Sequence, residues 1–133
     1  MRYFNIAGPC NVIEHYMIDA STRLNGVEQL IDMKQYFVIH AARQSGKTTY
    51  LQDLTKRLNA GEKYYALYCS LEVVQNIIDP KSGIPAIISC LKDSFLDYDI
   101  PFGDKFADTA DLTDYVSVLK AALSRICKLL DKP

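Results

Sequence analysis

The apolar and polar residues of this 133-residue chain form two kinds of pattern. Where an apolar residue recurs every three or four positions, the pattern predicts an amphipathic helix. Residues 36–40 and 64–71 instead form nearly continuous apolar runs, rich in aromatic or β-branched side chains, as is typical of strands buried in a parallel sheet. With a shorter apolar run at residues 3–7, the order along the chain is β α β α β α α. This alternation predicts an α/β fold with a parallel sheet and right-handed crossovers.

Four helices are expected, and capping or turn residues indicate where they begin and end. Asn25, with Glu28 three positions later, has the pattern of a capping box. Gly61 is a suitable stop for the second helix, the third is expected to begin near Pro85, and the last near Asp111. The stripes expected to be buried are Val27, Leu30 and Ile31; Leu51, Leu54 and Leu58; Ile84, Ile87, Ile88, Leu91 and Phe95; and Leu112, Tyr115, Val116, Leu119, Leu123, Ile126 and Leu130.

Between the run at residues 36–40 and the second helix, residues 41–48 read Ala-Ala-Arg-Gln-Ser-Gly-Lys-Thr. The phosphate-binding loop of nucleotide-binding proteins, the Walker A motif, has the pattern G-x-x-x-x-G-K-[ST] between a strand and a helix. Gly46, Lys47 and Thr48 match the pattern, and Ala41 replaces its first glycine. The predicted strand before it and the predicted helix after it make the match more specific than its letters alone. The alternative is an ordinary strand-to-helix turn that happens to contain Gly-Lys-Thr.

Each part of this loop has an expected contribution to binding a purine nucleoside triphosphate. Backbone N–H groups and the N-terminus of the following helix would bind phosphate oxygens. Gly46 lets the backbone approach the phosphates, Lys47 would reach the β- and γ-phosphates, and the Thr48 hydroxyl would bind Mg²⁺. The nucleotide-binding residues predicted from the motif are Ala41, Ala42, Arg43, Gln44, Ser45, Gly46, Lys47, Thr48 and Thr49.

Ala41 is the main departure from the pattern. If this position requires a positive φ, alanine costs on the order of 1–3 kcal/mol of local strain. Because about 1.4 kcal/mol changes an equilibrium constant tenfold, such strain would weaken nucleotide binding by about one or two powers of ten. The substitution therefore predicts weaker binding rather than its loss.

Composition favours a single domain over residues 1–133 and narrows the other function classes. The net charge of −1 supports neither a nucleic-acid surface nor a membrane surface, and the longest apolar stretches are far short of a membrane span. The N-terminus lacks a signal-peptide pattern, and the four cysteines form neither a C-x-x-C pair nor a zinc spacing. We therefore expect a cytoplasmic protein in which Cys69 and Cys90 are reduced core residues. The aspartates between residues 97 and 111 lack the calcium-loop pattern and predict a solvated loop.

Several stretches together resemble the bacterial AAA-like P-loop ATPases, whose loop reads roughly A-P-R-Q-x-G-K-T. They read N-I-A-G-P from residue 5, H-Y from 15, Y-F-V-I-H-A from 36, R-Q-S-G-K-T-T from 43 and A-L-Y-C-S-L-E from 66. The resemblance implies a P-loop NTPase fold that binds ATP and Mg²⁺, and it places His15 or Tyr16 near the adenine. An aromatic packing role is the alternative for Tyr16.

The same resemblance implies that the chain is the N-terminal portion of such an ATPase. The strand with the acidic Walker B pair would begin where the chain ends, at Pro133, so the fold would be incomplete and the sensor and arginine finger absent. We therefore expect ATP binding with little hydrolysis by this chain alone. A sheet that lacks the strands between the runs at 36–40 and 64–71 would expose an apolar edge, which favours self-association.

Two other functions remain open from the sequence. The chain could be a small P-loop phosphotransferase in which Glu72 assists at the metal or the substrate. Such an enzyme needs lid arginines, and Arg57 and Arg125 are the only arginines after the loop. It could also be a non-catalytic interaction module whose loop has lost nucleotide binding through Ala41.

Overall fold

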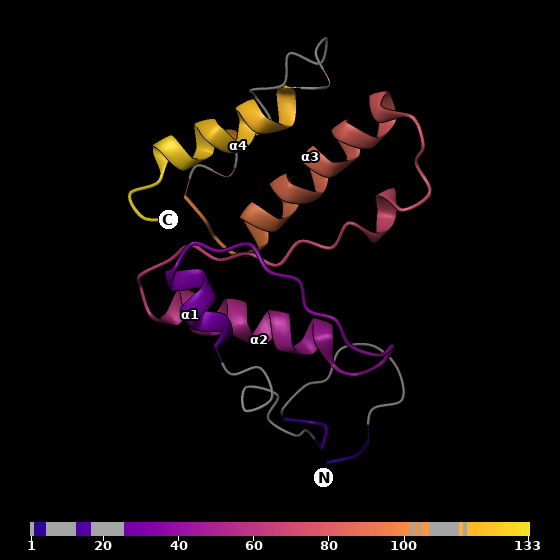
Figure 1. The fold of residues 1–133 in the computed structure, drawn as a ribbon, viewed down its shortest axis with the longest axis vertical. Helices are drawn as coiled ribbons and strands as arrows, with labels where there is room; N and C mark the ends of the chain where they lie inside the picture. The colour runs from indigo at the N-terminus through magenta and orange to yellow at the C-terminus, as the bar shows by residue number, and fades with distance from the viewer. Residues whose placement is uncertain are drawn as a thin grey trace. The chain divides into compact units, whose positions relative to one another are not determined.

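The structure is a computed structural model that describes residues 2–4, 13–16, 26–101, 103, 105–106, 115 and 117–133. Helices account for 54% of these residues (Figure 1). Helix α1 is Val27–Asp32, α2 is Lys47–Ala60, α3 is Pro80–Asp97 and α4 is Val118–Leu129, and a 3-10 turn, η2, covers Glu72–Val74. The predicted helices at these places are confirmed, although several of their ends differ from the expected ones.

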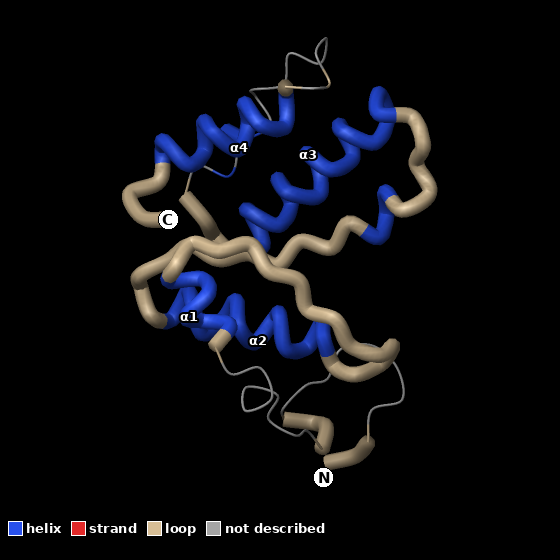
Figure 2. Tube along the Cα trace, in the orientation of Figure 1, coloured by secondary structure: helices blue, strands red, loops and turns tan. Residues whose placement is uncertain are grey.

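The prediction of an α/β P-loop fold with a parallel sheet is wrong. Within the described residues, β-type pairing is confined to an isolated parallel bridge between Tyr3 and His15, and residues 35–42 and 64–71 run as irregular chain (Figure 2). A parallel strand satisfies its backbone groups only through neighbouring strands, and a buried one covers both of its faces. Tyr36 is fully exposed and Val38 is 76% exposed, so the first apolar run lacks the burial that a central strand needs.

Contacts within the chain gather into two compact units, Met1–Leu54 and Thr55–Pro133. The first unit contains α1, residues 35–46 and the start of α2. The second contains the rest of α2, the turn η2 and the helices α3 and α4. That the chain forms a single domain stays a prediction.

The second unit contains the hydrophobic core, which α3 and α4 build with the residues between them. The α3 stripe predicted from the sequence is confirmed at Ile88 and Phe95, both buried, while Ile84 and Leu91 pack against the core half-buried. Cys90 on the same helix and Cys69 before η2 are free, half-buried thiols. They carry no disulfide, as expected of reduced residues, but neither belongs to the buried core. The buried core residues are Ile88, Phe95, Ile100, Phe106, Val118, Ala122 and Ile126.

Helix α4 buries a stripe that coincides only in part with the expected one: Ile126 is buried as predicted, and Leu119 and Leu130 pack half-buried against the core. Its buried residues are Val118, Ala122 and Ile126, which recur every four positions, and Leu123, expected in the stripe, is 40% exposed. Residues spaced by four lie on one face of a helix, and this face includes the small Ala122, which the spacing of large apolar residues does not indicate. The expected start near Asp111 lies outside the described residues.

Helix α3 begins five residues before the expected position at Pro85. Asp79 is its N-cap, and its Oδ1 accepts a hydrogen bond from the backbone N–H of Lys81 at 3.1 Å. Pro80 follows at the first helical position, where its missing N–H and fixed φ are tolerated. The Asp-Pro pair is therefore the stronger start signal, and Pro85 lies inside the helix.

A glycine lies at the start of α1, and another directly follows the end of α2. The N-cap of α1 is Gly26, with φ 94° and no side-chain cap bond, in place of a capping box at Asn25, which lies outside the described residues. Gly61 directly follows α2 as predicted, and its N–H donates to the carbonyl of Arg57 at 3.1 Å. After that turn, Asn59 bonds both backbone groups of Ala66 at 2.8 Å, which ties the end of α2 to the half-buried segment that follows.

Candidate functional site: the loop before α2

The candidate phosphate-binding loop connects the irregular residues 35–42 with α2. Residues 41–46 and Thr48 are exposed, whereas Lys47 and Thr49 are half-buried. Helix α2 begins at Lys47, so the motif is placed at a helix N-terminus as the sequence predicts. The motif residues therefore lie together on one accessible turn of the chain.

The backbone of this loop turns through two left-handed residues. Gln44 has φ 61° and Gly46 has φ 86°, and the N–H of Ser45, between them, donates to the carbonyl of Ala42 at 3.3 Å. The first α-helical bond runs from the N–H of Tyr50 to the carbonyl of Gly46 at 2.9 Å. Alternation of left-handed and right-handed residues is the geometry of an anion-binding nest, and the first N–H groups of a helix have no acceptor within that helix.

The Lys47 ammonium is held over the loop by two backbone carbonyls. Its Nζ donates to the carbonyl oxygens of Ala41 and Ala42, each at 2.8 Å. These bonds reach back across the turn from the first residue of α2 to the end of the preceding segment. They hold the positive charge against the loop backbone, and they give the two alanines a role through their carbonyls that their side chains do not indicate.

Ala41 does not carry the strain that its replacement of glycine suggested. The described non-glycine residues with positive φ are Lys34, Gln44, Glu62 and Asp99, so the backbone at Ala41 suits any L-residue. The weaker binding expected from this substitution therefore loses its physical premise. The left-handed positions fall later, at Gln44 and Gly46, and no sequence signal marked Gln44 because glutamine has no special preference for this conformation.

The contact of Thr48 with Mg²⁺ stays a prediction. The Thr48 side chain is exposed in the first turn of α2, beside the Lys47 charge and the helix N-terminus. Mg²⁺ in nucleotide sites takes few protein ligands and completes its shell with phosphate oxygens and water. Among the described residues, no group of three or more His, Cys, Asp and Glu side chains is arranged to hold a metal ion by itself.

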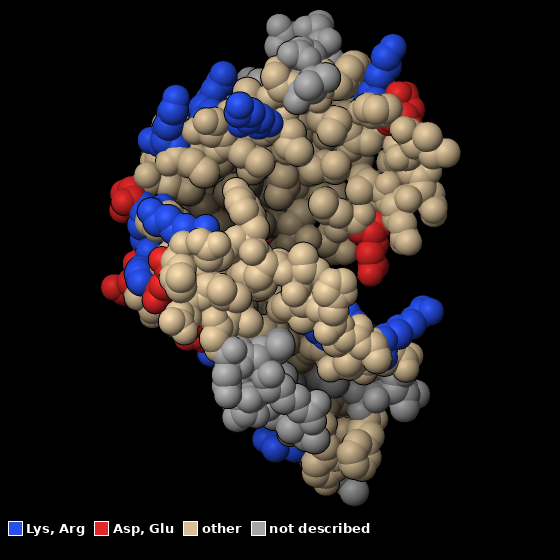
Figure 3. Space-filling view, in the orientation of Figure 1, with Lys and Arg blue, Asp and Glu red and all other residues tan. Residues whose placement is uncertain are grey.

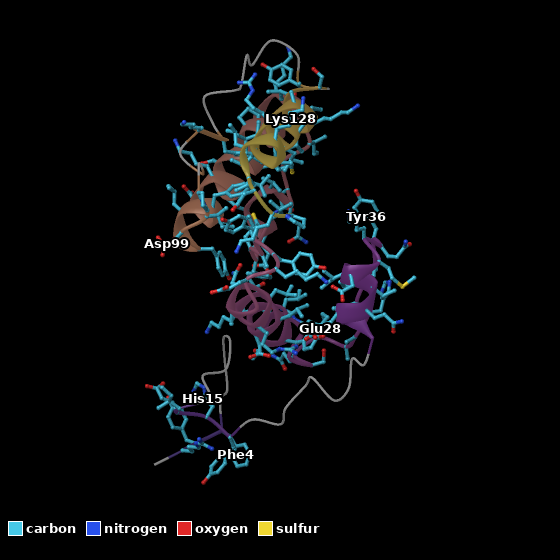
Figure 4. The ribbon with its side chains drawn as sticks, turned by 90° about the vertical axis from the view of Figure 1, so that its left-hand side faces the viewer. Phe4, His15, Glu28, Tyr36, Asp99 and Lys128 are labelled. Carbon is cyan, nitrogen blue, oxygen red and sulfur yellow. The ribbon has the colours of Figure 1, made fainter. Side chains whose placement is uncertain are left out.

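His15 and Tyr16 belong to a small aromatic cluster near the N-terminus, where His15 and Phe4 are marked in Figure 4. His15 is buried and stacks edge-on against Tyr3 with ring centroids 4.7 Å apart. Tyr16, which is 57% exposed, contacts the Phe4 ring at 5.1 Å. The cluster gives Tyr16 the aromatic packing role that was its alternative, and a contact of either residue with adenine stays a prediction.

The groups invoked for a phosphotransferase lie in the second unit. Glu72 is the exposed first residue of η2, Arg57 is in the last turn of α2, and Arg125 is exposed on α4. None of these positions is required by the geometry of the loop, and the contribution of Glu72 stays a prediction.

The comparisons with known proteins add no relative: no protein-family model matches the chain, and neither a characterised protein nor a solved structure shows significant similarity to it. Within the described ranges, no helix combines the length and apolar character that crossing a membrane requires.

Proposed function

We propose that the chain binds ATP with Mg²⁺ through residues 41–49, as part of a protein similar to the AAA-like P-loop ATPases. The observation that supports this most is the placement of the Lys47 ammonium, 2.8 Å from two loop carbonyls, at the N-terminus of a 14-residue helix. A cation, left-handed turns and helical N–H groups on one exposed loop form an arrangement suited to phosphate oxygens.

In this proposal each loop group meets a different part of the nucleotide. The backbone N–H groups around Gly46 and the start of α2 donate hydrogen bonds to the phosphate oxygens. The Lys47 ammonium has three N–H groups, of which two bond loop carbonyls, so its third N–H bonds the β- and γ-phosphate oxygens. The Thr48 hydroxyl is one ligand of the Mg²⁺ that the nucleotide brings. Arg43 is exposed on the loop and adds a second positive charge nearby.

The proposal concerns binding and not turnover. Hydrolysis needs a further acid at the metal, a group that orients water and a positive charge for the transition state, and the proposal assigns none of these to this chain. The parallel sheet is not part of the proposal either. The interaction-module alternative is weakened, because the backbone at Ala41 has no positive φ that alanine would oppose.

The direct test is isothermal titration calorimetry of the chain with ATP in the presence of Mg²⁺. We expect binding that falls at least about tenfold, or about 1.4 kcal/mol, in the Lys47→Ala variant. Lys56→Ala is the matched control, since Lys56 is an exposed lysine on the same helix, away from the loop, and should leave the affinity unchanged. Equal affinity of the parent and Lys47→Ala, or no binding by the parent, would contradict the proposal.

A further inference from the structure

The C-terminal end of α3 has an acidic face, formed by Asp93, Leu96, Asp97 and the next exposed acid, Asp99. All four side chains are exposed, and Leu96, at 52% exposure, lies among the carboxylates. The last turn of α3 has no basic residue. Negative charge at a helix C-terminus opposes the helix dipole, and like charges four positions apart repel. The acidic face therefore destabilises α3 itself.

Helix α4 has the complementary face, formed by Lys120, Leu123, Ser124 and Lys128. These residues recur at spacings of three, four and eight, so they share the side of α4 opposite the buried Val118, Ala122 and Ile126. All four are exposed, and Leu123, at 40% exposure, supplies an apolar contact beside Lys120. Figure 3 shows basic side chains gathered over α4. This basic face resembles the acidic face in size and in having leucine among the charges.

Among the residues that the structure describes, the two faces are not neutralised by ion pairs. Within the described ranges, Asp93, Asp97, Lys120 and Lys128 form no ion pair. In Figure 4, Asp99 and Lys128, one residue of each face, lie on different sides of the second unit. A charge-complementary partner for each face is, however, present on every other copy of the chain.

We propose that the acidic face of one copy docks on the basic face of a second copy. Asp93 and Asp97 then lie against Lys120 and Lys128, while the exposed leucines of the two faces meet between the charges. Because the two faces differ, the contact is heterologous and leaves a free face at each end, so association continues beyond a dimer unless a ring closes. Exposed ion pairs contribute little individually, so the assembly is weak and concentration-dependent.

The test uses sedimentation velocity on the whole nucleotide-free chain over a concentration series that reaches about 1 mM. This series covers the dissociation constants expected of a small polar interface. We expect the mean mass to rise with concentration at low salt and to return to the monomer in about 1 M NaCl, where the Debye length is about 3 Å. A monomer at every concentration in low salt would overturn the proposal, as would assembly that salt leaves unchanged.

Charge reversal identifies the faces. The double variants Asp93→Lys with Asp97→Lys, and Lys120→Glu with Lys128→Glu, should each lose association at least tenfold. An equimolar mixture of the two should recover it, because each reversed face then meets a partner of opposite charge. The control, Lys56→Glu with Lys81→Glu, makes the same charge change as the second variant at exposed lysines outside both faces, and should associate like the parent.

Continued assembly of either double variant alone, or no recovery in the mixture, would show that another surface is used and would overturn the proposal. Circular dichroism of each variant establishes that its helices are intact, and the salt dependence of the parent tests the proposal independently of any variant. Because neither face includes the loop before α2, the Lys47→Ala variant should associate normally, so the proposals on nucleotide binding and on assembly are decided separately.

Discussion

Replacing Gly46 by alanine should weaken nucleotide binding for a reason that is purely conformational. Gly46 has φ 86°, a conformation that L-residues rarely adopt, and a Cβ built on it would meet no atom within 4 Å. The substitution therefore introduces no clash, and its whole cost lies in the backbone. Among the loop residues, this makes Gly46 the clearest position at which to separate loop shape from loop charge.

The strain of holding a non-glycine residue in such a region is about 1–3 kcal/mol. If the loop keeps its shape, the strain appears as lost folding stability. If the loop relaxes to a negative φ, the N–H groups near the start of α2 turn away from the phosphates, and the same free energy appears as an affinity loss of about one or two powers of ten. We expect most of it in affinity, because the exposed loop relaxes more easily than a packed segment.

Gly26→Ala is a matched control in the same unit of the chain. Gly26 has φ 94° with no atom within 4 Å of its added Cβ, so its backbone strain is comparable, but it caps α1 and lies outside the motif. Urea unfolding measures the stability of both variants, and calorimetry with ATP and Mg²⁺ measures their affinity. If Gly46→Ala binds ATP as tightly as the parent, or if Gly26→Ala loses as much affinity, the loop geometry is not what binds the phosphates.

Other perturbations test the fold and the loop separately. Gly103→Ala should destabilise the chain by about 1–3 kcal/mol, because the added Cβ would lie 2.6 Å from the Cβ of the core residue Phe95. Gly83→Ala, inside α3, adds a Cβ whose nearest contact is at 3.6 Å. It should stabilise the chain by about 1 kcal/mol in the same urea titration. Ala41→Gly should leave ATP affinity unchanged by calorimetry, since Ala41 has no positive φ to relieve. The hydrogen bond from the Tyr65 hydroxyl to Asp131 raises the pKa of Tyr65 above 10.0. This contact therefore stabilises the fold below pH 10 and is lost as the pH rises through the raised pKa, so unfolding free energies of the parent and Tyr65→Phe should converge in alkaline buffer.

The helices could be predicted because their signals are local. Apolar spacing within a few turns placed α2 and α3, and Gly61 ended α2 where expected. The errors at helix starts arose where two local signals competed: Asp79-Pro80 began α3 ahead of Pro85. In α4 the small Ala122 occupies the buried face that large residues were expected to fill, because packing depends on the opposing surface as well as on side-chain size.

The sheet could not be predicted in the same way, because strand pairing depends on residues far apart in the chain. An apolar run such as residues 36–40 indicates a preference for burial, but it does not provide the neighbouring backbone that a parallel strand requires. The run at 64–71 shows the difference. Its side chains from Tyr64 to Cys69 are half-buried, and Tyr65 and Leu67 pack on the helical core, so the apolar pattern is satisfied in part without any ladder.

The same distinction explains why the error in the fold does not remove the support for the candidate site. The hydrogen bonds that shape the loop join residues no more than six positions apart: Lys47 to Ala41 and Ala42, and Tyr50 to Gly46. Such a loop needs only its own residues and the first turn of α2, and neither depends on a sheet. Hydrolysis differs, because its acid, its water-orienting group and its transition-state charge come from other elements that only a correct tertiary arrangement brings together. A local motif therefore supports a proposal about phosphate binding, whereas a proposal about catalysis needs the long-range structure that sequence pattern predicted incorrectly.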